Sequence, residues 1–420
     1  MASWFKLTPT ASGLTKLYIS TLLSGMWSMF LPGIPVMAVH FEITPGTAAQ
    51  LVTALAFGRL AGMPISGVVL DRLGTRAALI AGPALAFAMA LLAALMPWFS
   101  MILLLVFILG IAESVWVIAR EVAGIDLVRA DQRGRVLSGF HGINYLGLAL
   151  GPLAGGFLTE MGGFRGAFIA YAGCAALSVL LGVSVENSRP SFGPPGGPAV
   201  SGWHLDAWRQ RLQGLNKLFE QIEPKLRSTY IVLVFATLTS FMHRVTTQSI
   251  LPLFATTELG LSPKEIGVLF TISGVAAFLM ILPAGFVIDK VGRKWATVPS
   301  TGIPALAFLL IPFADNFLQL SLLLFFLGIA NGLSLGSLAT STFDVVPTSA
   351  RGRLQAARRT VAEIGGVGAP LLGGFLADTF NPGVPFLAYA PLIILSAVLL
   401  AFIGRETLPK QSKEAARSLR

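Results

Sequence analysis

Ionisable side chains occur inside stretches of the chain that are otherwise apolar, where burying a charge costs about 3 kcal/mol and therefore needs a reason. Arg59 and Glu113 each lie roughly 18–20 Å from the end of their stretch at 1.5 Å per helical residue, so they can meet at one depth. Arg359 and Glu363 are four residues apart and share a helix face. A carboxylate beside a guanidinium at this depth can take up and release a proton, or it can only neutralise the arginine. Glu113 and Glu363 are therefore candidates for proton uptake.

Two more arginines lie within apolar stretches. Arg358 adjoins Arg359, and Arg244 lies about two-thirds of the way along its own apolar stretch. Guanidinium donors match the oxygens of carboxylate and phosphate groups. Arg59, Arg244 and Arg358 are therefore candidates for binding an anionic substrate.

Aromatic and methionine side chains accompany these charges. Such side chains adapt to varied amphipathic ligands, although they can equally face lipid or a neighbouring helix. The candidates for an apolar cavity wall are Trp27, Phe30, Trp116, Phe241 and Met242.

The apolar stretches themselves have the length of membrane spans. The 420 residues are 54% hydrophobic and 12% charged, whereas a soluble domain carries roughly 25% charged residues. A crossing needs about 20 apolar residues. We expect an all-α membrane protein with twelve spans, at 15–38, 47–70, 76–96, 101–124, 136–158, 164–185, 228–251, 264–288, 294–314, 318–341, 354–376 and 383–404.

Arginine and lysine gather in alternate loops, which is the pattern of membrane orientation. It places both termini and the central linker in the cytoplasm, with the protein in the inner membrane. It also accounts for the net charge of +10 without nucleic acid. The first residues lack the pattern of a cleaved signal, so the first apolar stretch is expected to remain as a span.

The two halves of the chain repeat in sequence with a constant offset. Asp71 matches Asp289 and Asp126 matches Asp344, each 218 residues later. Six spans per copy give a parallel repeat, with two six-helix bundles related by a pseudo-twofold axis along the membrane normal. The expected domains are 1–189, a cytoplasmic linker at 190–227, and 228–420.

The expected linker begins with a run rich in Pro and Gly and continues as an amphipathic helix. Its apolar positions recur from Leu205 to Leu226 at alternating spacings of three and four, opposite a basic face. A helix lying on the inner leaflet is expected, either as a packing strap between the halves or with a regulatory role.

A loop motif ends the second span and recurs, in register, after the eighth. The residues from Gly67 to Arg76 and from Gly285 to Lys294 resemble the cytoplasmic loop signature of the major facilitator superfamily, and the resemblance covers essentially the whole chain. The first copy departs at Thr75, where the family usually has a base. The resemblance implies a cytoplasmic gate, with Arg76 paired to Asp126; the alternative is that these charges only fix topology. The gate candidates are Gly67, Asp71, Arg72, Gly74, Arg76, Asp126, Gly285, Asp289, Lys290, Gly292, Arg293 and Asp344.

The motif's residue types have physical uses. Gly67 and Gly285 are expected to let helices approach closely, and Gly74 and Gly292 to permit tight turns. The aspartates can accept hydrogen bonds at the N-terminus of a neighbouring helix.

A second likeness concerns transport direction. The run from Gly147 to Gly156 is similar to the antiporter motif of drug-efflux members, and its glycines are expected to form a smooth surface for the opposing half. The arginine that drug antiporters carry in the fourth span is absent, because Phe107 stands at its position.

The resemblance implies a function as well as a fold. In this family the first, fourth, seventh and tenth spans line the cavity, which makes Glu113, Arg244 and Asn331 candidate lining residues. The chain is closest in pattern to bacterial drug/proton antiporter-like members. We expect proton-coupled efflux of small lipophilic or amphiphilic compounds by alternating access. Proton-linked uptake of an organic anion, or lipid translocation by the same fold, are the alternatives.

Other classes find little support in the sequence. Four scattered His and the lone Cys174 offer no metal site or nucleophile cluster for an enzyme, and no ATP-binding loop is present. We expect a monomer without cofactor or metal. Its expected partners are a small-molecule substrate, the proton as coupling ion, as the resemblance implies, and the lipid bilayer.

Overall fold

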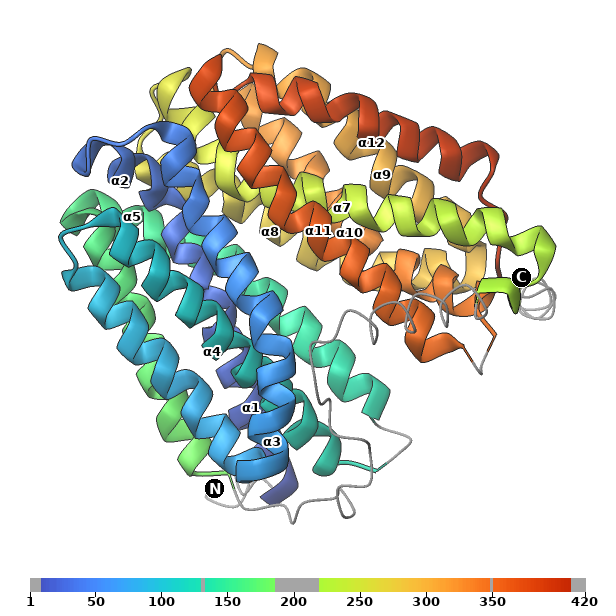
Figure 1. Cartoon of the computed structure of the whole chain (residues 1–420), viewed down its shortest axis with the longest axis horizontal. Coiled ribbons are helices and arrows are strands. Elements are labelled where there is room, and N and C mark those ends of the chain that lie inside the picture. Colours follow the sequence, from blue (N-terminus) through green and yellow to red (C-terminus); the bar gives the residue numbers. More distant parts are fainter. Residues whose placement is uncertain (1–8, 130–132, 186–218, 348–349, 409–420) are drawn as a thin grey trace, which may run out of the picture. The chain divides into compact units, whose positions relative to one another are not determined.

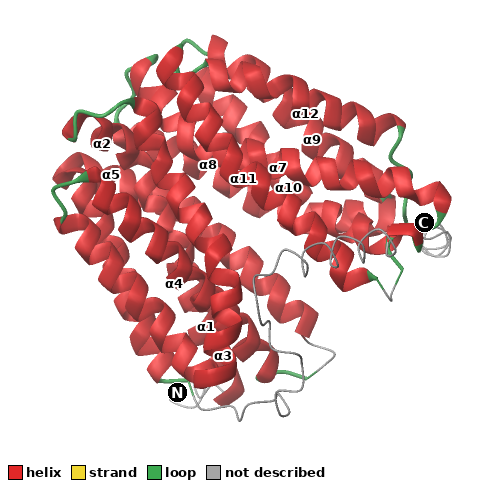
Figure 2. Ribbon diagram, viewed as in Figure 1, coloured by secondary structure: helices red, strands yellow, loops and turns green. Residues whose placement is uncertain are grey.

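The computed structural model describes residues 9–129, 133–185, 219–347 and 350–408, and these are helical with short connecting loops (Figure 2). The first half contains α1 (Pro9–Gly25), the 3₁₀ segment η1 (Met26–Gly33), α2 (Ile34–His40), α3 (Pro45–Leu95), α4 (Phe99–Asp126) and α5 (Arg133–Val183). The second half contains α7 (Pro224–Thr257), α8 (Pro263–Phe286), the π segment η2 (Val287–Val291), α9 (Arg293–Leu310), η3 (Ile311–Phe313), α10 (Phe317–Val345), α11 (Arg351–Thr379) and α12 (Val384–Phe402).

Two of these helices are each a pair of membrane crossings joined by a glycine turn. α3 and α5 have 51 residues each, about 77 Å at 1.5 Å per residue, against a hydrocarbon core of about 30 Å. The chain turns at Gly74 (φ 81°) in α3 and at Gly163 (φ 67°) in α5, a backbone region in which a side chain is strained. These turns fall between the expected spans, as the sequence predicts.

The expected number of crossings is confirmed in the described residues. Nine helical segments are long and apolar enough to span a membrane, and α3 and α5 each supply two crossings. α7 is the twelfth, since its 34 residues are long enough to cross although they are less apolar. Its lower hydropathy follows from His243, Arg244 and a series of hydroxyl side chains.

The chain forms two compact units. The first unit is Met1–Pro195 with Gln248–Gly274, and the second is Gly196–Thr247 with Val275–Arg420. The segment 248–274, which contains the end of α7 and the start of α8, therefore packs with the first unit, whereas the expected boundaries assign it to 228–420. Those boundaries remain a prediction.

In the first unit, helices approach one another through glycines. α3 and α4 run side by side (Figure 1), and a Cβ built on Gly58 would lie 3.0 Å from the Cα of Gly110. α5 packs on α1 in the same way, where a Cβ on Gly147 would lie 2.9 Å from the Cα of Gly25. Small residues at such contacts allow close packing between membrane helices.

The glycines of the run from Gly147 to Gly156 pack mainly against the first span, which belongs to the same unit. A Cβ on Gly155 would meet Met29 of η1, and one on Gly156 would meet Pro263 at the start of α8. The hydroxyl of Thr271 also donates to the carbonyl of Ala149 (2.8 Å). The expected smooth surface is thus largely occupied by α1, η1 and the part of α8 that belongs to this unit.

In the second unit, α7, α10, α11 and α12 enclose an apolar core that includes Tyr230, Leu233, Leu338 and Leu354. The hydroxyl of Tyr230 donates to the carbonyl of Leu354 (2.9 Å). Ile222, at the end of the expected linker, is buried in the same core. The rest of the expected linker helix, 205–218, lies outside the described residues, so its role remains a prediction.

Candidate substrate and proton site

A buried carboxylate in the first unit is held by two donors. Glu113 of α4 is 3% exposed, and it accepts from Nε of Arg59 on α3 (2.8 Å) as well as from a terminal nitrogen of the same guanidinium. Its other oxygen accepts from the hydroxyl of Tyr171 on α5 (2.5 Å). The expected pairing of Arg59 with Glu113 is therefore observed. Tyr171 is an additional donor that the sequence analysis did not single out.

The helix contacts that position this pair lie directly beside it. Gly58 precedes Arg59, and Gly110 lies one turn before Glu113, so α3 and α4 approach each other closely next to the ion pair. Ser114 reinforces the contact, because its hydroxyl donates to the carbonyl of Arg59 (2.6 Å). With these helices so close, the two charged side chains need not extend far to meet.

An aromatic group packs around the pair. The guanidinium of Arg59 lies 4.4 Å from the ring of Trp27, which comes from the 3₁₀ segment η1 in the first span. Phe30 stacks on Phe168 (4.2 Å between centroids) and meets Tyr171 edge-on (5.2 Å). A 3₁₀ stretch within a long helix often marks a hinge or a functional site.

The candidate cavity residues of the first unit are packed in its interior. Trp27, Phe30 and Trp116 are 6%, 2% and 0% exposed, and the indole N–H of Trp116 donates to the hydroxyl of Ser20 (2.9 Å). Of the two in the second unit, Met242 is buried and Phe241 is half-buried. Contact of these side chains with a ligand remains a prediction.

The second unit holds a polar cluster between α7 and α10. Nε of Arg244 donates to the side-chain oxygen of Asn331 (2.9 Å), and the same guanidinium bonds the hydroxyl of Ser334. The buried ring of His243 lies 3.3 Å from that Asn331 oxygen and 3.1 Å from the carbonyl of Thr239. Arg244 and Asn331, which the family resemblance names as lining residues, are thus direct neighbours.

The two arginines of α11 differ in their partners. Arg359 pairs with Glu363 (2.7 Å) as expected, and its guanidinium lies 4.9 Å from the ring of Phe241. Arg358 instead donates to the side chains of Gln355 (2.9 Å) and Thr237 (3.0 Å). Its partners are neutral, as are those of Arg244.

The second copy of the loop motif forms an ionic bridge. Arg293, at the start of α9, donates to Asp344 at the end of α10 (3.0 Å) and to Asp289 in η2 (2.8 Å). The preceding Gly292 has φ 153°, which favours glycine. Glu406, beyond α12, accepts from the backbone N–H groups of Arg293 (2.9 Å) and Lys294 (3.3 Å), where the helix dipole favours an anion.

Among the described residues, position 75 of the first copy offers no counterpart of Arg293 for this bridge. The position 218 residues before Arg293 is Thr75, whose side chain cannot carry a positive charge between two carboxylates. Arg76 donates to the carbonyl of Val183 (3.0 Å) and not to Asp126, so the pairing that the resemblance implied is not the one observed. Asp71 is exposed. The two copies therefore differ at the motif position held by Thr75 in the first and Arg293 in the second.

The remaining motif glycines behave differently from the expectation. A Cβ built on Gly67 or on Gly285 would meet no atom within 4 Å among the described residues. Neither therefore mediates a close helix approach here. Arg72 and Lys290 are exposed, and their place in a gate remains a prediction.

We expect Thr75→Arg to supply the missing bridge and Arg293→Thr to remove the existing one. The loss of hydrogen bonds to two carboxylates at about 1.5–3 kcal/mol lowers the melting temperature of purified Arg293→Thr by roughly 5 °C, at about 2–4 °C per kcal/mol. Thr75→Arg raises the melting temperature by about 2–4 °C. The gain is smaller than the loss in Arg293→Thr, because an ion pair with the exposed carboxylate of Asp71 contributes little.

Lys290→Thr removes an exposed charge of the same loop and serves as the control, with an expected change near zero. If Arg293→Thr and Lys290→Thr melted at the same temperature, the bridge would have no structural importance.

Comparison with known proteins identifies the class that this fold and these sites define. The chain matches the Major Facilitator Superfamily over residues 17–220 and 233–419. It belongs to that family and is a secondary transporter, a multi-pass protein of the inner membrane and not an enzyme.

Among its relatives is the multidrug resistance protein MdtG of Enterobacter lignolyticus (strain SCF1), which is 25% identical over 434 residues, covering 96% of this chain and 95% of the relative. MdtG of Klebsiella pneumoniae (strain 342) is 24% identical over 414 residues, with 92% of each chain covered.

Solved structures share the fold. A D-xylose–proton symporter superposes with a TM-score of 0.73 at 17% identity, covering 94% of this chain and 98% of the symporter. A peptide transporter superposes with a TM-score of 0.75 at 15% identity, with 94% and 95% covered. At these identities the likeness concerns the fold alone.

Proposed function

We propose that this chain exports small lipophilic or amphiphilic compounds in exchange for protons, and that Glu113 carries the proton. The observation that supports this is the arrangement around Glu113, a buried carboxylate with one cationic and one hydroxyl donor at membrane depth. Ionisable groups at such depth are associated with proton relays and substrate pathways. The MdtG relatives, named as multidrug resistance proteins, favour efflux.

The ion pair suggests how the proton acts. When Glu113 is charged it holds Arg59, and when it is protonated the charge that attracts the guanidinium is lost. A ligand shifts a conformational balance only through a difference in its affinity for the two states. Arg59 packs on Trp27 of the 3₁₀ segment. If Arg59 moves when Glu113 is protonated, the proton binds the two conformational states with different affinity.

The proposal includes the setting of the transporter. It works as a monomer in the inner membrane, with both termini and the linker in the cytoplasm, as the distribution of basic loops predicts. The expected domains 1–189 and 228–420 are the two bundles that alternate access to the substrate.

A second candidate substrate class, an anionic compound, is favoured by one observation. Arg244 and Arg358 lie within spans and hydrogen-bond only neutral side chains among the described residues, whereas Arg59 and Arg359 each have a carboxylate partner. A guanidinium without a counter-ion is available to a carboxylate or phosphate group of a substrate.

The test is transport in proteoliposomes with an imposed pH gradient, using matched pairs of amphiphiles that differ only in an acidic group. We expect gradient-driven movement of lipophilic compounds, and its absence for the whole panel would contradict the proposed function. If the anionic member binds Arg244, Arg244→Gln raises its KM by about 10- to 100-fold, the loss of a charged hydrogen bond. An equal loss for the neutral member would exclude the anionic class.

A further inference from the structure

A hollow in the second unit lies where helices α7, α9 and α12 end or begin. Its volume is about 550 Å³, and its lining includes Lys225, Ser228, Lys294, Phe402, Arg405 and Glu406. None of these side chains belongs to the ion pairs or to the polar cluster of Arg244. Glu406 accepts from backbone N–H groups at the start of α9. The hollow is therefore a separate feature of the second unit.

The hollow gathers three positive charges and, among the described residues that line it, a single carboxylate. Lys225 and Arg405 are exposed and Lys294 is half-buried, and none of the three forms an ion pair with any described residue. The single carboxylate of the lining, Glu406, accepts from the backbone N–H groups of Arg293, Lys294 and Leu408 (2.9, 3.3 and 3.0 Å). Its charge is thus engaged by the helix terminus, and the three cations face the hollow uncompensated.

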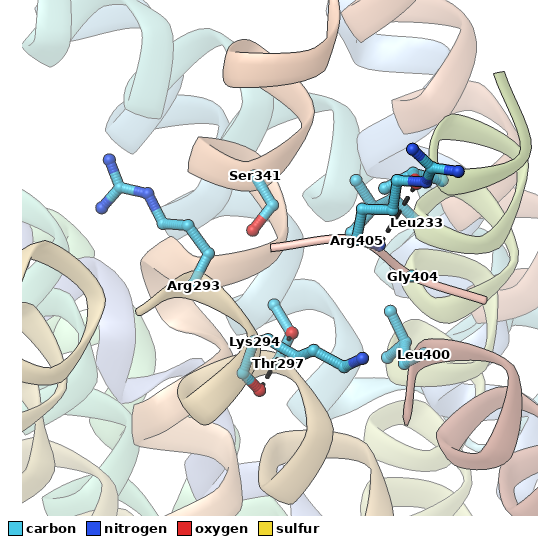
Figure 3. Close-up of a pocket in the computed structure, with 9 residues that line it drawn as sticks. Leu233, Arg293, Lys294, Thr297, Ser341, Leu400, Gly404 and Arg405 are labelled. Carbon is cyan, nitrogen blue, oxygen red and sulfur yellow. Dashed lines mark hydrogen bonds between the residues drawn. The ribbon is translucent and has the colours of Figure 1, made fainter. Parts of the chain in front are cut away.

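The walls of the hollow are fixed to the fold. Besides the bonds of Glu406 to α9, the backbone N–H of Arg405 donates to the hydroxyl of Thr229 on α7 (3.2 Å). Figure 3 shows Lys294 and Arg405 in the small adjoining pocket, which shares these two residues with the hollow. Lys225 and Lys294 are therefore carried by the helices α7 and α9 themselves, and Arg405 by a segment bonded to both helices.

The hollow also lies at a defined depth. The membrane span of α12 ends at Phe402, and that of α9 begins at Arg293. Phe402 is 84% exposed, and Trp295, one residue beyond Lys294, is 69% exposed. Cations bordered by exposed apolar and Trp side chains at the ends of two spans are the arrangement expected at the boundary between hydrocarbon and headgroups.

We propose that this hollow binds the phosphate headgroup of an anionic phospholipid, with an acyl chain running along Phe402. Basic pockets between helices at the cytoplasmic interface suit anionic headgroups, and the ammonium and guanidinium donors match phosphate oxygens. The exposed apolar side chains favour a lipid over a free phosphate ion, because an inorganic anion leaves them without a contact.

The experiment measures lipid retention by the purified full-length protein, by native mass spectrometry, with phosphatidylglycerol or phosphatidylcholine added at equal concentration. We expect phosphatidylglycerol to be retained preferentially. Each of Lys225→Gln, Lys294→Gln and Arg405→Gln weakens that retention by about fivefold, the effect of removing one basic residue at a membrane surface.

Lys290→Gln is the matched control, because it removes an exposed charge beside the same helix end that does not line the hollow. Lys225 is exposed on the first turn of α7, so its substitution should leave folding intact even if the others do not. The proposal is overturned if phosphatidylcholine is retained equally, if Lys225→Gln behaves like Lys290→Gln, or if inorganic phosphate displaces the lipid and binds alone. Lipid retention requires no transport, so this test is independent of the proposed function.

Discussion

The Glu113→Gln protein is expected to bind its substrate but to lose the effect of pH on that binding and on transport. Gln keeps the shape of Glu113 and can still accept a hydrogen bond from Arg59 or Tyr171, but it cannot take up a proton. If Glu113 is the coupling group, the wild-type affinity changes with pH by about 5- to 150-fold, as for a coupling free energy of about 1–3 kcal/mol. In the variant that factor falls to one.

The measurement is substrate affinity at two pH values together with transport driven by an imposed pH gradient. Folding should survive the substitution, because the side chain of Arg59 is 33% exposed and its charge is not left fully desolvated. Counterflow, in which substrate exchanges without net proton movement, is expected to persist.

Glu121→Gln is a suitable control, since Glu121 lies on the same helix two turns further on and is not among the hydrogen-bond partners of Arg59 or Tyr171 in the described residues. A Glu113→Gln protein that still accumulates substrate against a gradient would leave the pair with a structural role only. Glu363, which pairs with the more exposed Arg359, would then be the remaining candidate carboxylate.

Gly58→Ala is expected to destabilise the first unit strongly, because the added methyl group has no room between α3 and α4. The added Cβ would clash with the carbonyl of Phe107 and lie 3.0 Å from the Cα of Gly110. Both are backbone atoms, which cannot move away by a change of rotamer. Overpacking of this kind costs about 1–3 kcal/mol. The separation of α3 from α4 also moves Arg59 away from Glu113, so coupled transport is expected to fall together with stability.

Gly173→Ala is the matched control, because Gly173 is an exposed glycine of α5 and an added Cβ would meet no described atom within 4 Å. Its melting temperature should equal or exceed that of the wild type, since Ala is favoured over Gly in a helix by about 1 kcal/mol. If Gly58→Ala melted as Gly173→Ala does, the close contact of α3 and α4 would not be what positions the ion pair.

The amino-acid sequence by itself determined the number of crossings and the repeat. Spans of about 20 apolar residues follow from the thickness of the bilayer, which each segment meets independently of its neighbours. The glycine turns at Gly74 and Gly292 could also be anticipated, because their local backbone geometry favours a residue without a side chain. Pairs that depend on depth alone, such as Arg59 with Glu113, could also be anticipated.

What the sequence could not supply was which side chains face one another around each helix. Tyr171 and Tyr389 occupy matching positions in the repeat, yet Tyr171 donates to Glu113 and Tyr389 to the carbonyl of Ala369. Arg76 was expected to pair with Asp126 and instead reaches Val183. The sequence predicts the depth of Tyr171 and Arg76 but not their partners, because rotation about a helix axis changes the partner of a residue without changing its depth.

Glu113 shows which features the sequence determines and which the tertiary structure decides. Its depth and its arginine were determined by the spacing of charges along two apolar segments, since each residue adds a fixed rise to a helix. Its second donor, its aromatic neighbour Trp27 and the glycine contact beside it were decided only by the tertiary structure. These depend on how α3, α4, α5 and η1 pack, and packing brings together residues that are far apart in the chain.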